Sequence, residues 1–220
     1  MVAKLALPVV LSLALAGCGG SVAPRAAEGP RVSAPARSPI SPDGKLCLTE
    51  LAAQRAAFSP LPDRYHGPGC SVVGAVNLTA VGADAGRLAI TNLGPLTCNA
   101  ATTLAGWARY GVDRAARQIL GSPLRSIETM GSYACRNVGG SSRRSAHARA
   151  DAIDIGAFVL ADGRRITVRG GWTGSREERE FLRVVHRSAC KRFGTVLGPD
   201  YNAAHEDHLH LEPGDGSFCR

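Results

Sequence analysis

Apolar residues recur at three- and four-residue steps in two stretches of the chain, which predicts two amphipathic helices. The first begins at Asn99, a residue type that caps helices, and ends near residue 120. The second begins at Ser175, which forms a capping-box pattern with Glu178, and continues to about Phe193. The apolar faces of both helices are expected to be buried in the core.

Strands are predicted where short apolar runs alternate with polar residues or turn signals. Residues 125–133 have this pattern, and residues 155–160 and 164–168 flank an Asp-Gly turn, which is typical of a hairpin. Near the end of the chain, Leu209 and Leu211 alternate with polar residues, so the leucines are expected to face the core.

Together these elements predict an α+β fold. A small antiparallel sheet is expected to carry the functional residues, with the helices at about 100–120 and 176–193 flanking it. Residues 46–98 are rich in Gly and Pro and are expected to form short strands and irregular loops.

The N-terminal residues differ in composition from the rest of the chain. Residues 1–17 contain a short apolar run after Lys4 and are typical of a secretory signal peptide. The run ends in Leu-Ala-Gly-Cys, which resembles a bacterial lipobox and predicts lipidation of Cys18. Residues 18–43 lack apolar periodicity and are interpreted as a disordered tether, followed by one domain at 44–220. This organisation predicts an exported bacterial lipoprotein that is anchored to a membrane and faces the periplasm.

Cysteine usage agrees with export to an oxidising compartment. Six cysteines remain once Cys18 is set aside: Cys47, Cys70, Cys98, Cys135, Cys190 and Cys219. An even number predicts three disulfides, and the sequence leaves all of their pairings open. None of the six has C-x-x-C spacing, so a cysteine zinc site is not expected.

The chain is basic, with a formal net charge of +8. For an exported protein, this charge favours anionic envelope polymers or lipid head groups over nucleic acid as partners. A basic surface that only increases solubility is the alternative.

Two polar clusters contain the candidate chemistry. Residues 205–212 hold three histidines and three carboxylates, and residues 145–155 hold His147 and Asp154. A catalytic zinc site needs about three protein ligands, commonly His with Asp or Glu, and one open position. The pair His147 and Asp154, together with one or two imidazoles from His208 and His210, can supply such a set.

The motif Ser145-x-His147-x-x-Ala150-x-Ala152-x-Asp154, with Asp207-His208-x-His210 near the end, resembles the zinc D-Ala-D-Ala peptidase superfamily, which includes lysostaphin-type enzymes and hedgehog domains. Residues 131–136, 159–165 and 195–202 are similar to bacterial extensin-like C-terminal domain proteins. This second resemblance covers roughly residues 47–219.

The resemblance implies a role for each residue that matches the motif. His147, Asp154 and His210 would be the zinc ligands, with water in the fourth position. Asp207 would take a proton from that water and return it to the leaving amine. His208 would lie beside the metal, and Arg136 would bind a substrate carboxylate or the developing oxyanion. The chain departs from the pattern that the resemblance implies at two positions, with Ala150 where Gly is common and Asp207 where Glu also occurs. Among the remaining carboxylates of the stretch, Glu212 is the better candidate to orient a ligating imidazole.

A zinc peptidase acting on peptidoglycan stem peptides or cross-bridges is therefore the leading hypothesis. A wall-binding or scaffolding lipoprotein with a structural zinc site is the alternative. In a third hypothesis, Cys135 is a thiol nucleophile with His205 or His208 as its base, which the even cysteine count disfavours.

Overall fold

The computed structural model describes residues 42–220 of the chain. The predicted signal peptide, Cys18 and all but the last two residues of the predicted tether lie outside the described residues. Those two residues belong to the first helix, which the sequence pattern did not predict. None of the helices in the described part is both long and apolar enough to span a bilayer.

The α+β class is confirmed, but the sheet is large and mixed rather than small and antiparallel. Ten strands form it in the order β1-β4-β5-β7-β8-β11-β10-β12, with β6 also paired to β4 and β9 to β8. The strands are β1 (Ala57–Pro60), β4 (Ala75–Ala83), β5 (Gly86–Thr91), β6 (Pro95–Thr97), β7 (Leu124–Gly131), β8 (Ile153–Leu160), β9 (Arg165–Thr167), β10 (Thr195–Leu197), β11 (Leu209–Glu212) and β12 (Phe218–Cys219). A separate hairpin consists of β2 (Arg64–Gly67) and β3 (Cys70–Val72).

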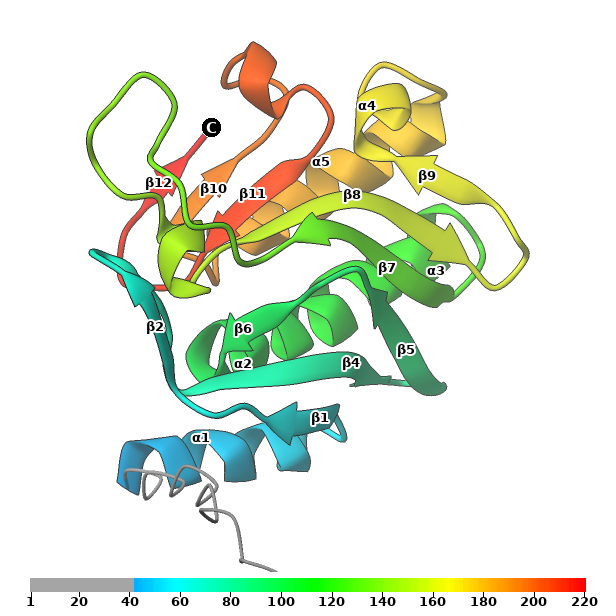
Figure 1. The fold of residues 1–220 in the computed structure, drawn as a ribbon. Coiled ribbons are helices and arrows are strands. Elements are labelled where there is room, and N and C mark those ends of the chain that lie inside the picture. The colour runs from blue at the N-terminus through cyan, green and yellow to red at the C-terminus, as the bar shows by residue number, and fades with distance from the viewer. Residues whose placement is uncertain (1–41) are drawn as a thin grey trace, which may run out of the picture. The chain divides into compact units, whose positions relative to one another are not determined.

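Two strand pairs are parallel, β5 with β7 and β10 with β12. The β5–β7 pair requires a long crossover, because parallel neighbours cannot be joined by a tight turn. The helical segment between β6 and β7 supplies this crossover and joins the N-terminal strands to the rest of the sheet (Figure 1).

The helices are α1 (Pro42–Ala53), α2 (Cys98–Trp107), the π-helical η1 (Ala108–Asp113), α3 (Arg114–Ile119), the 3-10 turn η2 (Ala146–Arg149), α4 (Val168–Gly171), α5 (Arg176–Cys190) and the 3-10 turn η3 (Ala203–His205). The first predicted helix corresponds to α2, η1 and α3, and its N-cap is Thr97 rather than Asn99. Thr97 provides the cap because its hydroxyl oxygen accepts a hydrogen bond from the backbone N–H of Ala100. The predicted capping box of Ser175 and Glu178 is present at the start of α5.

The main core lies between the sheet and the helices. The indole N–H of the fully buried Trp107 donates to the backbone oxygen of Val185 over 3.1 Å, which joins the crossover helix to α5. On the sheet, Ile155 and Leu209 are fully buried members of this core and lie opposite each other on β8 and β11. Because side chains alternate along a strand, Asp154 and His210 face the other side of the sheet, away from the helices.

Three disulfides are present, as the cysteine count predicts: Cys47–Cys98, Cys70–Cys135 and Cys190–Cys219. The first joins α1 to α2, the second joins β3 to the loop after β7, and the third joins the end of α5 to β12. The loop that leads to η2 is therefore covalently attached to the β2–β3 hairpin.

Candidate metal centre

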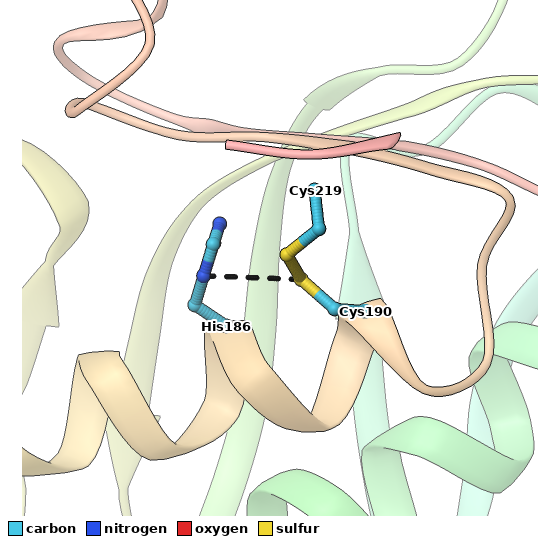
Figure 2. A group of neighbouring side chains, drawn as sticks. All are labelled: His186, Cys190 and Cys219. Atoms are coloured by element: carbon cyan, nitrogen blue, oxygen red, sulfur yellow. Dashed lines mark hydrogen bonds between the residues drawn. A yellow bond between two sulfur atoms is a disulfide. The ribbon is translucent and has the colours of Figure 1, made fainter. Parts of the chain in front are cut away.

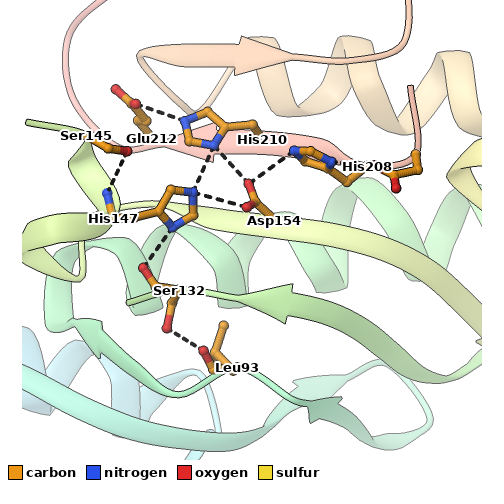
Figure 3. Close-up of polar contacts among 9 residues, drawn as sticks. Leu93, Ser132, Ser145, His147, Asp154, His208, His210 and Glu212 are labelled. Atoms are coloured by element: carbon orange, nitrogen blue, oxygen red, sulfur yellow. Dashed lines mark hydrogen bonds and ion pairs between the residues drawn. The ribbon is translucent and has the colours of Figure 1, made fainter. Parts of the chain in front are cut away.

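Three side chains from three different elements place nitrogen and oxygen atoms around one point (Figure 3). The Nε2 atom of His147 lies 3.2 Å from Nδ1 of His210. The Asp154 carboxylate lies 3.1 Å from His147 Nε2 through one oxygen and 2.9 Å from His210 Nδ1 through the other. These are the three residues that the motif resemblance implies as ligands.

The sheet register explains the position of two of these side chains. His210 on β11 lies directly opposite Asp154 on β8 in an antiparallel pair. The third, His147, belongs to η2, whose first turn is capped by the side chain of Ser145. This turn ends at Ala150, which has a left-handed backbone with φ of 55°. Glycine adopts that conformation most easily, and alanine does so uncommonly.

Each imidazole is fixed by a hydrogen bond on the side away from the shared point. His147 Nδ1 lies 2.9 Å from the backbone oxygen of Ser132, and His210 Nε2 lies 2.8 Å from the Glu212 carboxylate. Because both partners can only accept, these ring nitrogens carry the protons. The inward nitrogens can then bind a cation through their lone pairs, the arrangement that metal-binding histidines commonly have.

In the metal-free protein the cluster shares protons, and this changes the ionisation of its members. Burial alone would raise the pKa of Asp154, but hydrogen bonds to His147 and His210 outweigh it and lower that pKa below its usual range. Burial alone would lower the pKa of His210, but its hydrogen bonds to Asp154 and Glu212 raise it to about 9. The cluster therefore contains an anionic carboxylate and a protonated imidazole at neutral pH.

His208 and Asp207 lie next to the three-residue cluster. His208 Nε2 is 3.6 Å from the Asp154 carboxylate, and its Nδ1 is 2.8 Å from the Asp207 carboxylate. This hydrogen bond lowers the pKa of Asp207. Asp207 therefore meets the cluster through the ring of His208, and its other oxygen is 3.5 Å from the guanidinium of Arg169.

His205 and Arg136 lie at the edge of the site. The ring of His205 is centred 5.1 Å from that of His208 and 5.9 Å from that of His210. Burial, followed by the charges of these two histidines, lowers the pKa of His205 to about 4, so this ring is neutral at pH 7. Arg136 is exposed on the loop before η2, and its charge acts on His205 in the same direction.

A family model described as the C-terminus of extensin-like proteins matches residues 45–220. The chain belongs to this family. No curated protein and no solved structure gives a significant match to it. The predicted extensin-like resemblance is therefore confirmed, whereas the wider relation to zinc peptidases stays a prediction.

A second group in this extensin-like domain has the spacing of a metal site, namely His186, Cys190 and Cys219 (Figure 2). His186 Nδ1 lies 4.0 Å from Cys190 Sγ. The two cysteines form a disulfide, however, and a disulfide sulfur is not the thiolate that binds zinc. His186 is thus left as the single donor of that group.

The thiol-nucleophile hypothesis is wrong, because Cys135 forms a disulfide with Cys70 and so has no free thiol.

One contact of the candidate metal centre was not predicted from the sequence. His147 is oriented by the backbone oxygen of Ser132, and a backbone acceptor leaves no signal in the residue type.

Proposed function

We propose that this extensin-like domain is a zinc peptidase that hydrolyses amide bonds in the peptide part of peptidoglycan, tethered to a membrane through a lipid on Cys18. The observation that carries the proposal is the convergence of His147, Asp154 and His210, whose facing donor atoms lie 2.9–3.2 Å apart. Peptidoglycan as substrate, the periplasmic location and the anchor follow from the family resemblance and the N-terminal sequence.

The donor set fits zinc rather than a hard cation. Two imidazoles and one carboxylate are typical of zinc sites, whereas Mg²⁺ and Ca²⁺ are bound mainly by oxygen atoms. Zinc bonds of about 2.0–2.1 Å in a tetrahedron separate neighbouring donors by roughly 3.3 Å, close to the observed spacing. When bound at such a three-ligand site, zinc lowers the pKa of a coordinated water to about 7 and polarises a carbonyl group.

The remaining residues of the site would bind the substrate and move protons. His208 presents Nε2 to the cluster, and Asp207 holds its other nitrogen, so His208 is oriented to exchange a proton with, or hydrogen-bond, the reacting amide. In this arrangement Asp207 acts through His208, whereas the family resemblance implies direct contact with water. The exposed guanidinium of Arg136 is available for a substrate carboxylate.

Zinc content and digestion of purified sacculi test the proposal. A His147→Ala variant should lose zinc, and retention of stoichiometric metal would refute the ligand assignment. Asp207→Ala and His208→Ala variants should retain zinc and lose most of the cleavage, because both stand beside the ligands rather than among them. Unchanged turnover in either variant would remove that residue from the mechanism.

A second candidate is a wall-binding or scaffolding lipoprotein whose zinc is structural. It is compatible with the near-complete burial of His147 and His210, at 2% and 6% exposure, which leaves little of these side chains open to solvent. Tight binding to sacculi without any released fragment in mass spectrometry would support this candidate over the peptidase.

A further inference from the structure

A groove of about 460 Å³ lies beside the candidate metal centre, on the face of the sheet opposite the main core. It forms where β8 changes partner along one edge. There, β11 pairs with residues 153–155 of β8, and β9 pairs with residues 157–159. Gly156 lies between these two pairings and forms part of the groove lining.

The groove and the metal centre are neighbours on one surface. Asp154 and Gly156 are two positions apart on β8, so they share a face and lie about 7 Å apart along the strand. Asp207 also lines the groove, and it connects to Asp154 through His208. A chain bound across Asp154 would therefore enter the groove within about two residues.

The floor of the groove depends on the absence of a side chain at Gly156. A Cβ atom placed there would lie 3.2 Å from Cγ of Met130, whose side chain borders the same groove and is 57% exposed. Any larger side chain at position 156 would displace Met130 and reduce the volume for a ligand.

Two arginines line the groove, and their donors differ in availability. Arg165 donates two hydrogen bonds to the Glu128 carboxylate, one from Nε over 2.9 Å and one from Nη2 over 2.6 Å. Within residues 42–220, Arg169 makes polar contacts only through Nη2, at 2.6 Å from Glu206 and 3.5 Å from Asp207. The remaining N–H groups of its guanidinium can donate hydrogen bonds to a further ligand.

The Arg169–Glu206 pair is readily exchanged. The two side chains are 65% and 55% exposed, and ion pairs at such sites contribute little to stability. A planar guanidinium binds carboxylates through two parallel hydrogen bonds, which favours a ligand that brings such a group into the groove.

We infer that this groove is a substrate subsite in which Arg169 binds a free carboxylate located within a few residues of the cleaved amide. Arg169 exchanges Glu206 for the substrate carboxylate, so acidic peptides are preferred over their amides. This inference rests on the proposed peptidase function, and it adds the chemical class of the substrate.

The inference is tested with two synthetic stem-type peptides that differ at one group. One has a free glutamate α-carboxyl, and the other has the α-amide in its place. Binding to the metal-free chain by calorimetry and hydrolysis by the zinc-loaded chain are measured separately. The acidic peptide should bind about tenfold more tightly than the amide, and its kcat/KM should be higher by a similar factor. Equal binding of the two peptides would overturn the subsite even if both are cleaved. Selective binding without cleavage would refute the peptidase and leave the subsite standing.

Two variants separate ligand binding from a structural ion pair. Arg169→Gln should abolish the preference for the acidic peptide and leave the affinity for the amide unchanged. Glu206→Gln removes the competing acceptor and should strengthen binding of the acidic peptide. If the Arg169–Glu206 pair were only structural, both variants would change the affinity for the acidic peptide in the same direction. That result would overturn the inference. Arg125→Gln, at an exposed position on β7, is the matched control for the loss of one positive charge.

Discussion

Replacing Glu212 by Gln is the sharpest test of how the metal centre is held. The Glu212 carboxylate accepts the Nε2 proton of His210 over 2.8 Å, and Gln can keep this hydrogen bond through its amide oxygen while removing the negative charge. The charge makes the inward nitrogen of His210 a better donor to a cation. Glu212→Gln should therefore weaken zinc binding without moving the ring.

The expected magnitude follows from the exposure of the carboxylate. Loss of a group that orients a ligand commonly reduces metal affinity by about 10- to 100-fold, or about 1.4–2.7 kcal/mol. The Glu212 side chain is 32% exposed, so solvent screens part of its charge, and the lower half of that range is expected for Gln. Glu212→Ala also removes the acceptor and should reach the upper half.

Proton competition makes this effect depend on pH. Glu212 is one of the groups that raise the pKa of His210 to about 9 in the metal-free chain, so zinc must displace a proton at pH 7. Removing Glu212 lowers that pKa and eases the competition, which offsets part of the lost affinity. The loss should therefore be smaller at pH 7 than at pH 9.

Competition with a chromophoric chelator at both pH values measures the affinity. Glu180→Gln, an exposed position on α5, is the control for the same change of charge and should leave zinc affinity unaltered. Zinc affinities of Glu212→Gln and Glu212→Ala that match the wild type at both pH values would refute the role of His210 as a ligand held by Glu212.

Three further predictions concern ionisation and stability. In the metal-free chain, the pKa of His210 is raised from 6.5 to about 9, so its contribution to stability is complete below about pH 6.5 and is lost as the pH rises through 9. The thermal unfolding temperature of the wild type should fall over this pH range, and that of His210→Gln should not show this fall. Asp113 is fully buried and accepts from Leu124 N and Arg117, and Arg117 is 34% exposed, so Asp113→Ala mainly leaves the Leu124 N–H unpaired and should cost about 1–3 kcal/mol in urea unfolding. Asp84→Ala, which breaks exposed ion pairs, should have a minor effect. Replacing Cys190 and Cys219 by Ser should destabilise the domain by about 3.5 kcal/mol, because the disulfide closes a loop with a separation of 29 residues, and a denaturation midpoint equal to that of the wild type would contradict this value.

Local patterns predicted the elements whose signals are local. The capping box of Ser175 and Glu178 was found because both partners lie within one turn, and β7, β8 and β9 were found because alternation and an Asp-Gly turn are short-range features. The chemistry of the two polar clusters indicated the candidate ligands, but only the motif resemblance selected His147, Asp154 and His210 from them, since no local pattern relates His147 to His210.

Features that depend on contacts between distant parts of the chain were not predicted. The helix α1 carries a weak apolar pattern, and its position depends on contacts with α2 and on the Cys47–Cys98 disulfide. The parallel β5–β7 pair joins residues 89–91 to 126–128, and no signal in either segment specifies the other. The groove also arises from tertiary structure, because it depends on two strands that meet the same edge of β8 on either side of Gly156.

The direct pairing of His210 with Asp154 means that metal binding at the candidate centre would depend on strand alignment. A slip of β11 by one residue would place Leu209 or Leu211 opposite Asp154 and turn the imidazole toward the core. Zinc would therefore bind the native alignment and not its nearest competitor, so the ion would select the correctly paired chain during folding.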